Sequence, residues 1–327
     1  MQRPTAGALP RKPDTLSGMA RKTTRKSPRP LLAVLSRKKR LYSTRRLVES
    51  ARARGMRTRV VDVLACNLVL EQGRPRVFLA GEELRDVAVA VPRIGASVTA
   101  AGLAVVRQLE AEGVPVVNCA AGIANSRDKL RALQLLAAAG VDMPRTVLAR
   151  GGGDIKELVA HVGGLPAILK LIQGTQGVGV MIAHSEAEVE SILSTLWDLG
   201  QEILLQEFIA ESRGRDVRAL VVGDRVVGAM RREARSGDFR SNLHRGGEGS
   251  ALELSAGYAQ AAVRAARVLG LDVAGVDLLE AEKGPKVMEV NSSPGFEGLE
   301  RATGLDIAGA IVDHAARLAA RVARANG

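Results

Sequence analysis

The chain has 327 residues, of which 46% are apolar, 25% are charged and 2% are aromatic. Its length suffices for two domains or one multilobed domain with a sizeable core, which excludes a disulfide-stapled miniprotein. One Trp, two Tyr and four Phe are too few for the repeated stacking platforms of single-strand nucleic-acid binders. No apolar stretch reaches the roughly 20 residues that span a bilayer. We therefore expect a cytoplasmic protein without a membrane partner.

Positive charge is concentrated at the N-terminus. Residues 1–30 hold eight lysines and arginines against one acid, Asp14, and so contribute +7 of the formal net charge of +12. Their Pro, Ser, Thr and basic composition predicts a disordered basic tail with a salt-sensitive attraction to RNA. The rest of the chain is only mildly basic, so the high net charge describes an appendage more than a basic folded domain.

After the tail, strand and helix patterns alternate. Short apolar runs typical of buried strands lie at 31–36, 59–66, 87–95 and 114–118. Helical patterns separate them at 43–55 and 98–113. This alternation predicts a parallel sheet with helices on both faces. We place a first α/β domain at 31–118.

Beyond residue 118 the pattern changes from parallel units to antiparallel hairpins. Helices are expected at 126–139, 186–199, 258–270 and from Asp306 onward, with a short one between the first two strands that follow. Strands are expected at 145–150, 166–172, 202–209, 216–222, 225–233, 272–281 and 286–293. The fold class is therefore α/β followed by α+β.

Two acids interrupt the last pair of apolar strands. In a hairpin centred on Lys283, Asp277 lies directly opposite Glu289, and Asn291 shares their face. Like charges so placed destabilise a sheet, so Asp277→Asn would relieve repulsion in the metal-free protein. Two carboxylates and an amide oxygen form a site that suits Mg²⁺ or Mn²⁺. The alternative is a solvated edge at which both acids face water.

A lysine and a glycine-rich loop form the second pattern. Lys170 shares a strand face with Ile168 and Ile172, an expensive place for an ammonium group unless an anion meets it. The loop GTQGVG that follows has glycines at Gly174, Gly177 and Gly179. Glycines allow backbone N–H groups to approach phosphate closely. A plain hairpin turn is the alternative.

Three further segments are compatible with nucleotide or substrate binding. Lys129 lies near the start of the 126–139 helix and can reach a phosphate, although a solvated helix lysine is equally compatible. The strand end at 206–209 has an acid and backbone groups able to bind adenine and ribose, although a plain strand end is equally compatible. Between 231 and 245 there are five arginines against two acids, a composition suited to carboxylate and phosphate or to a solvated loop.

In this order, these features resemble the ATP-grasp ligases. The segments SRDKLRALQLL, GTQGVGV, RSGDFRSNLHRGG, VAGVDLL and MEVNSSPGFEGLE are similar to those of the RimK family, ATP-dependent glutamate ligases that modify the C-terminus of the sixth small-subunit ribosomal protein. The resemblance covers nearly all of 31–315 and leaves the tail unexplained. It implies a Rossmann-like pre-ATP-grasp domain at 31–118 and an ATP-grasp domain at 119–327, with a central lobe at 126–205 and a C-terminal lobe at 206–320.

The resemblance also implies the site residues. Asp277, Glu289 and Asn291 would ligate two ions of Mg²⁺ or Mn²⁺. The nucleotide ATP would contact Lys129, Lys170, Gly174, Gly177, Gly179, Glu207, Phe208, Asp216, Arg240, Ser241 and Asn242. Arg232 and Arg240 would be the catalytic arginines, which stabilise an acyl phosphate and the oxyanion formed when an amine attacks it.

The implied reaction joins glutamate to the C-terminus of a small-subunit ribosomal protein, and we expect the enzyme to form a homo-oligomer. A carboxylate is a poor acyl donor, so ATP would first convert it to an acyl phosphate. One alternative is a same-fold ligase that acts on a small-molecule cofactor or a carrier protein. Another is a non-catalytic protein that associates with RNA or the ribosome, although Lys170 together with the acidic hairpin favours an enzyme.

Overall fold

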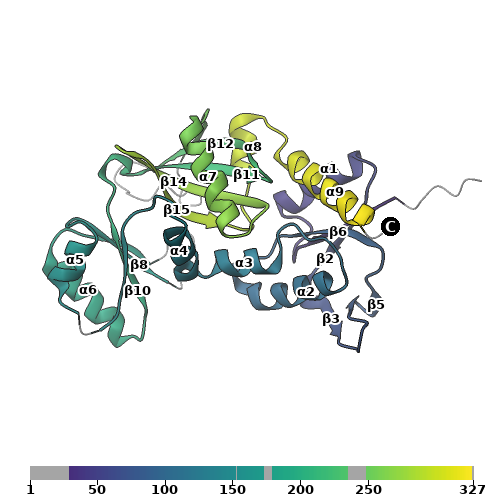
Figure 1. Ribbon diagram of the computed structural model, residues 1–327, viewed down its shortest axis with the longest axis horizontal. Helices are drawn as coiled ribbons and strands as arrows, with labels where there is room; N and C mark the ends of the chain where they lie inside the picture. Colours follow the sequence, from purple (N-terminus) through teal and green to yellow (C-terminus); the bar gives the residue numbers. More distant parts are fainter. Residues whose placement is uncertain (1–28, 152, 173–178, 235–247, 326–327) are drawn as a thin grey trace, which may run out of the picture.

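The structure is a computed structural model that describes residues 29–151, 153–172, 179–234 and 248–325. The described strands form sheets in the orders β2-β1-β6, β3-β4-β5, β7-β10-β8-β9 and β13-β12-β11-β14-β15. In Figure 1 the N-terminal domain and the four-stranded sheet lie at opposite ends, and the five-stranded sheet lies between them. None of the helices in these ranges combines the length and the apolar character needed to cross a membrane.

The N-terminal domain is a parallel sheet between two helical layers, as the sequence predicts. Its strands are β1 (Leu31–Leu35), β2 (Arg57–Val61) and β6 (Val87–Pro92), and its helices are α1 (Tyr42–Ala53) and α2 (Thr99–Ala111). Successive side chains of a strand point to opposite faces. Leu32 and Val34 accordingly pack in one core with α1, whereas Ala33 and Leu35 pack in another with α2.

In this part of the chain two local expectations are wrong and one element was not expected. The run 114–118 forms only a single parallel bridge between Ala90 and Val116. The helix expected at 126–139 is divided into α3 (Ala120–Arg127) and α4 (Lys129–Ala138), because Asp128 is extended and its carboxylate accepts a hydrogen bond from the Arg131 backbone N–H at 2.9 Å. A small sheet was not expected; it contains β3 (Cys66–Val69), β4 (Arg76–Leu79) and β5 (Glu82–Glu83).

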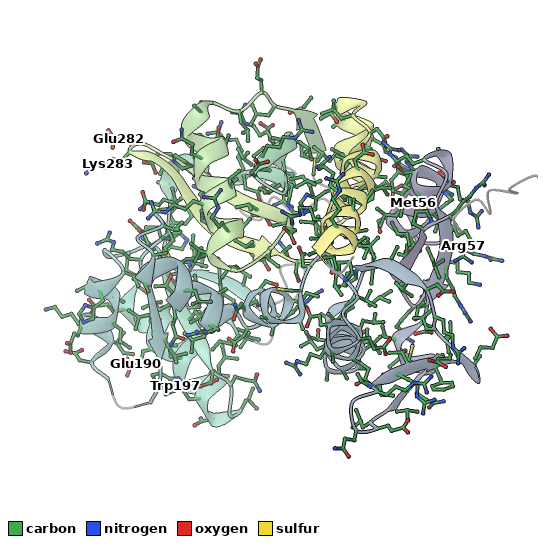
Figure 2. All side chains as sticks on the ribbon, turned by 45° about the vertical axis from the view of Figure 1, so that its right-hand side comes forward. Met56, Arg57, Glu190, Trp197, Glu282 and Lys283 are labelled. Atoms are coloured by element: carbon green, nitrogen blue, oxygen red, sulfur yellow. The ribbon has the colours of Figure 1, made fainter. Side chains whose placement is uncertain are left out.

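The central lobe is an antiparallel sheet that is covered by two helices. Its elements are β7 (Thr146–Ala149), α5 (Ile155–His161), β8 (Ala167–Leu171), β9 (Val180–Ala183), α6 (Glu186–Asp198) and β10 (Ile203–Glu207). Val159 of α5 and Leu193 of α6 are buried against the sheet. Figure 2 labels Trp197 at the end of α6, whose indole N–H donates to the Ala149 carbonyl at 3.1 Å. This lobe therefore has its own core.

The C-terminal lobe carries the acidic hairpin. Its elements are β11 (Arg215–Val222), β12 (Arg225–Glu233), β13 (Glu248–Ala251), α7 (Ala256–Val268), β14 (Val273–Ala281) and β15 (Gly284–Asn291). The turn between β14 and β15 is centred between Glu282 and Lys283, which Figure 2 labels at the outer tip. A register shift between Asp277 and Leu278 then restores the pairing of Asp277 with Glu289.

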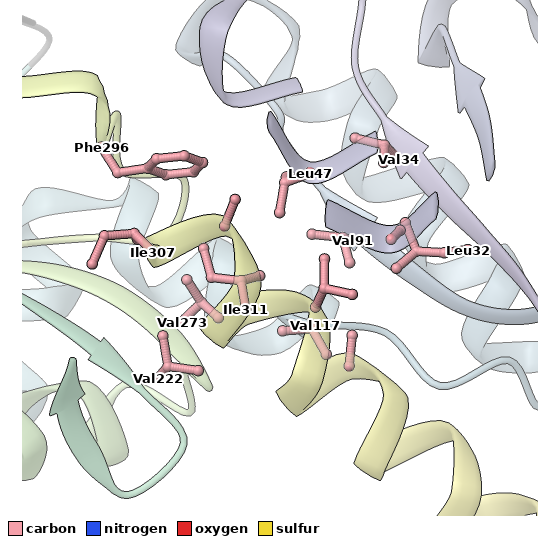
Figure 3. Close-up of a cluster of buried hydrophobic side chains, with 14 of the residues drawn as sticks. Leu32, Val34, Leu47, Val91, Val117, Val222, Val273, Phe296, Ile307 and Ile311 are labelled. Carbon is pink, nitrogen blue, oxygen red and sulfur yellow. The ribbon is translucent and has the colours of Figure 1, made fainter. Parts of the chain in front are cut away.

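The last two helices return to the N-terminal domain. They are α8 (Glu297–Thr303) and α9 (Ile307–Ala325). Figure 3 shows that side chains of α9 lie between those of the parallel sheet and those of the C-terminal lobe. This shared core includes Leu32, Val34, Leu47, Val91, Val117, Val222, Val273, Phe296, Ile307 and Ile311. The two ends of the chain are thus packed into one apolar cluster.

We expect truncation of Leu47 in this shared core to destabilise the protein strongly. Leu47→Ala removes a fully buried side chain and leaves a cavity, which costs about 2–5 kcal/mol of unfolding free energy. The matched control is Leu199→Ala, since Leu199 is 67% exposed and its loss should change stability by about 0.5 kcal/mol or less. Urea unfolding of both variants measures the difference; equal stabilities would contradict the assigned core.

Candidate active site

Lys170 lies on β8 and is held by an amide. Its ammonium group donates to Gln206 Oε1 at 2.6 Å, and Gln206 donates in turn to Thr146 Oγ1 at 2.8 Å. Burial lowers the pKa of Lys170 to about 8; the nearby charge of Glu289 opposes this shift and that of Lys129 adds to it. Among the described residues no carboxylate forms an ion pair with Lys170. The site is therefore suited to an anionic ligand.

Lys129 is brought to the same place by the break between α3 and α4. It is the first residue of α4, and its ammonium group donates to the Leu171 carbonyl at 3.1 Å. Burial lowers the pKa of Lys129, and the charge of Glu289 again opposes the shift. Glu289 therefore acts on both lysines. Three residues that the sequence placed in separate segments lie within electrostatic range of one another.

Gly179 ends the predicted glycine loop. Its φ of +74° is in the left-handed region, and an added Cβ would lie 2.6 Å from Leu171 Cδ1. Its carbonyl accepts a hydrogen bond from the Leu171 N–H at 3.0 Å. Both constraints favour glycine at this position. The other two predicted glycines, Gly174 and Gly177, lie outside the described residues.

Glu207 and Phe208 lie where β10 leaves the central lobe. Glu207 accepts hydrogen bonds from the backbone N–H and the guanidinium of Arg145, each at 3.0 Å, and Lys286 of β15 is 3.8 Å away. Burial raises the pKa of Glu207, but the Arg145 bonds and the nearby charges outweigh it and hold the pKa below its usual value. Phe208 is half-buried. This carboxylate thus links the central lobe to a strand of the C-terminal lobe.

The negative charge of the acidic hairpin is compensated by two arginines that the sequence did not point to. Asp277 does pair with Glu289, but Asp277 is buried while Glu289 is exposed. Two arginines contact the Asp277 carboxylate: Arg218, with one bond at 2.7 Å, and Arg232 at 3.1 Å. Burial raises the pKa of Asp277, yet the two guanidinium groups lower it by more. The expectation that Asp277→Asn relieves repulsion in the metal-free protein is therefore wrong.

A second carboxylate completes this buried network. Asp216 accepts two hydrogen bonds from Arg232, from Nε at 2.6 Å and from Nη2 at 2.8 Å. Burial lowers the pKa of Arg232, but the two carboxylates outweigh this and raise it. Asp216, Arg232 and Asp277 are all less than a tenth exposed. The other predicted residues of this lobe, Arg240, Ser241 and Asn242, lie outside the described residues.

The donor set on the hairpin suits a divalent cation. Glu289 is exposed and forms no ion pair with a described residue, and Asn291 is two positions further along β15. Within the described ranges, no cluster of three or more His, Cys, Asp or Glu side chains is placed to hold a metal. A metal site on this hairpin would be built from Asp277, Glu289 and Asn291. It would have two carboxylates and one amide oxygen as protein ligands, completed by water or phosphate.

Sequence reasoning missed two residues that contact the predicted site. Gln206 accepts the bond from Lys170, and Arg218 binds Asp277 from the neighbouring strand β11. Asp216 and Arg218 are two positions apart and so share a strand face. Pairing of their strand with 272–281 would have placed Arg218 opposite Asp277.

An α/β domain followed by two antiparallel lobes, with two lysines and an acidic hairpin brought together, defines an ATP-grasp ligase. Residues 31–123 match the RimK pre-ATP-grasp domain, and residues 126–315 match the RimK-like ATP-grasp domain. The chain belongs to the RimK family of ATP-dependent ligases, which join an acid to an amino acid. The expected family, fold and enzyme class are confirmed, and the non-catalytic alternative is not.

Curated relatives are identical to this chain at about half of the aligned positions. A probable alpha-L-glutamate ligase from Rhodopirellula baltica is 53% identical over 283 residues, which cover 86% of this chain and 70% of that protein. Another protein of the same name, from Aliivibrio fischeri, is 48% identical over 289 residues, which cover 88% of this chain and 96% of that protein.

Solved structures show the same fold. The RimK domain ATP-grasp protein from Sphaerobacter thermophilus is 27% identical, with a TM-score of 0.65 over 87% of this chain and 98% of that one. The ATP-grasp ligase PsnB, in complex with a precursor peptide and AMPPNP, is 24% identical, with a TM-score of 0.71 over 89% of this chain and 98% of that one. The PsnB likeness is one of fold alone.

We expect Lys170→Met to stabilise the nucleotide-free protein at neutral pH. The pKa of Lys170 falls from 10.5 to about 8 on folding, so its charge is a penalty that is complete below pH 8 and vanishes as pH rises to 10.5. Removing the charge should add up to about 3 kcal/mol at pH 7 and little above pH 10.5. Urea unfolding at both pH values measures this, with Lys156→Met on the exposed face of α5 as control. A stability gain that does not depend on pH would contradict the electrostatic cause.

Proposed function

We propose that this ligase joins the amine of glutamate to the C-terminal carboxylate of a protein, with a small-subunit ribosomal protein as the acceptor. The convergence of Lys129, Lys170 and Glu289 carries the proposal, because it supplies cations for phosphates beside a carboxylate for a metal. The names of the curated relatives support glutamate as the amine donor. Neighbours such as PsnB and the macrocyclase MdnC, each bound to a precursor peptide, support a peptide or protein acceptor.

Each described residue has a role in the proposed nucleotide site. Lys129 and Lys170 hold phosphate oxygens, and phosphate would restore the charge on Lys170 that burial weakens. Glu207 and Phe208, at the exit of β10, hold the adenosine end. Gly179, whose backbone is in the left-handed region, is the described residue of the predicted phosphate-binding glycines. By family resemblance, Gly174, Gly177, Arg240, Ser241 and Asn242 complete the site.

Asp277, Glu289 and Asn291 are the proposed ligands for two ions of Mg²⁺ or Mn²⁺. When bound, these ions neutralise phosphate charge during phosphoryl transfer. Arg218 and Arg232 keep Asp277 ionised, so the ligand is charged before any cation arrives. Metal affinity should therefore persist into mildly acidic solution.

The proposed reaction has two steps. The acceptor carboxylate attacks the γ-phosphate to give an acyl phosphate and ADP, and the glutamate amine then attacks the acyl carbon and expels phosphate. Arg232 and Arg240 are the proposed stabilisers of the charge that develops on the acyl phosphate and the oxyanion. Arg232 lies against Asp216 and Asp277, so it also positions the metal ligand.

Two further expectations concern partners. The basic tail at 1–30 lies outside the described residues apart from its last two, and we propose that it attracts RNA. The formation of a homo-oligomer stays a prediction.

Intact mass spectrometry tests the proposed function. Candidate acceptors, with small-subunit ribosomal proteins first, are incubated with the enzyme, ATP, Mg²⁺ and glutamate. We expect mass increments of one glutamyl residue and one ADP released per increment. A free C-terminal carboxylate is required, so an acceptor amidated at its C-terminus serves as the control. Increments on a small molecule or a carrier protein, with none on any ribosomal protein, would contradict the proposed acceptor.

The two hairpin acids should differ sharply when each is replaced by its amide. Glu289→Gln should lower Mg²⁺-dependent turnover at least about 100-fold. Its loss of stability should be smaller than that of Asp277→Asn, because Glu289 is exposed and has no ion pair among the described residues, although its charge acts on Lys129 and Lys170. Asp277→Asn should lose activity and also about 3–5 kcal/mol of stability, because it leaves buried arginines undercompensated. Turnover and urea unfolding are measured for both. Full activity of Glu289→Gln at limiting Mg²⁺ would refute its role as a ligand.

A further inference from the structure

Two arginines meet where the N-terminal domain joins the ATP-grasp lobes. Arg93 directly follows β6, and Arg127 is the last residue of α3. Arg93 donates to the Pro294 carbonyl at 2.6 Å and to Ser43 Oγ at 3.3 Å, and Arg127 donates to the Ile94 carbonyl. In both side chains the Nε group is buried and has no hydrogen-bond partner. Each guanidinium group therefore keeps unused donor capacity.

The electrostatics of this arginine pair, Arg93 and Arg127, are unusual for the interface around it. Burial, together with the nearby charge of Arg127, lowers the pKa of Arg93 to about 10. Neither arginine forms an ion pair with a described carboxylate. By contrast, Arg46 and Arg54 at the same junction bind Glu300 at 3.0 Å and Asp313 at 2.5 Å. Two half-buried cations close together are costly unless an anion meets them.

The arginine pair lies next to the proposed reaction centre but does not contact the proposed metal ligands. The charge of Glu289 raises the pKa of Arg127, although burial lowers it by more, and the same carboxylate acts on Lys129. Arg93 contacts the loop that follows Asn291, the last residue of β15. In that loop, the Ser292 and Ser293 hydroxyl oxygens are also buried without a hydrogen-bond partner. Unused polar groups from two domains thus gather next to the metal hairpin.

We propose that Arg93 and Arg127 bind the carboxylates of the incoming glutamate. This inference rests on the proposed function and adds the residues that hold its amine donor. A guanidinium group pairs with a carboxylate through two parallel hydrogen bonds, and the unused Nε supplies one of them. The reacting carboxylate of the acceptor must lie at the phosphates and the metal hairpin, so the arginine pair is left for carboxylates that do not react. Glutamate has two of these and the site has two guanidinium groups.

Selectivity follows from this arrangement. Glutamine has one carboxylate fewer and leaves one buried arginine without an anion, so the pair disfavours it. Aspartate keeps both charges but spans a shorter distance between them. The N-terminal domain, through Arg93, would then select the amino acid whose amine attacks the acyl phosphate formed by the ATP-grasp lobes.

The test compares two nucleophiles in wild-type enzyme and three variants. Arg93→Lys and Arg127→Lys keep the charge but lose bidentate geometry, and Arg46→Lys is the matched control because it crosses the same junction to Glu300. Each enzyme receives ATP, Mg²⁺ and a peptide with a free C-terminus that the wild-type enzyme converts to a hydroxamate. The nucleophile is either glutamate or hydroxylamine, which captures an acyl phosphate without any carboxylate.

We expect the KM for glutamate to rise at least about tenfold in Arg93→Lys and Arg127→Lys, while the KM for ATP and hydroxamate formation change by about twofold or less. Arg46→Lys should change none of these by more than that. Hydroxamate formation also reports that each variant is folded and binds ATP. In wild type, glutamine should be used far less efficiently than glutamate, and the Lys variants should narrow that preference.

The outcomes separate the two proposals. An equal loss of activity with glutamate and with hydroxylamine, or the same loss in Arg46→Lys, overturns the subsite. The arginine pair would then be a structural contact between the domains. An unchanged KM for glutamate in both variants overturns the subsite while the proposed function stands. Wild-type enzyme that forms hydroxamate but adds no glutamate contradicts the proposed function and the subsite with it.

Discussion

The buried ion network on β12, β11 and β14 is the constraint on which the active site depends. Asp216, Arg232, Asp277 and Arg218 alternate in charge across three neighbouring strands, so the network is neutral although its members are mostly removed from water. A buried pair of this kind adds little net stability over apolar residues, but breaking it by removing one partner is expensive. Its value here is positional: it fixes Asp277 as an ionised carboxylate at the point where a metal is needed.

The three parts of the chain are connected to one another in different ways. The N-terminal domain and the C-terminal lobe share one apolar core and are further bound by the contacts of Arg46 with Glu300 and Asp306. The central lobe has a separate core among the described residues. Among the described residues, polar contacts link it to the rest of the chain, such as those of Glu207 with Lys286 and of Lys129 with the Leu171 carbonyl. Polar links of this kind permit relative motion of a lobe, as expected where a nucleotide must enter and ADP must leave.

The sequence predicted the facing of Asp277 and Glu289 correctly but for an incomplete reason. A turn centred on Lys283 gives that pair directly, whereas the real turn lies half a residue earlier and the register shift beside Asp277 compensates. The alternation of apolar and polar residues along the two strands could not reveal the register shift between Asp277 and Leu278. The role of Lys170 was predictable because an ammonium group on an apolar strand face is costly unless an anion binds it.

What the sequence could not predict depends on contacts between distant segments. Arg218 looked like an ordinary strand residue until β11 was paired with β14, which follows much later in the chain. The break at Asp128 was hidden because the residues on both sides favour helix, and only the side-chain cap divides them. Arg93 and Arg127 are unremarkable in sequence, and their unused donors become visible only when two domains close around them.

The return of α9 to the first sheet has a consequence for how the protein is made. One face of β1, with Leu32 and Val34, is covered by Ile311 and Val312, which a ribosome delivers almost three hundred residues later. Until α9 has been synthesised, that apolar face is covered only in part, by α1, and is a target for chaperones or for other exposed chains. Complete packing of the N-terminal sheet thus waits for the synthesis of α9.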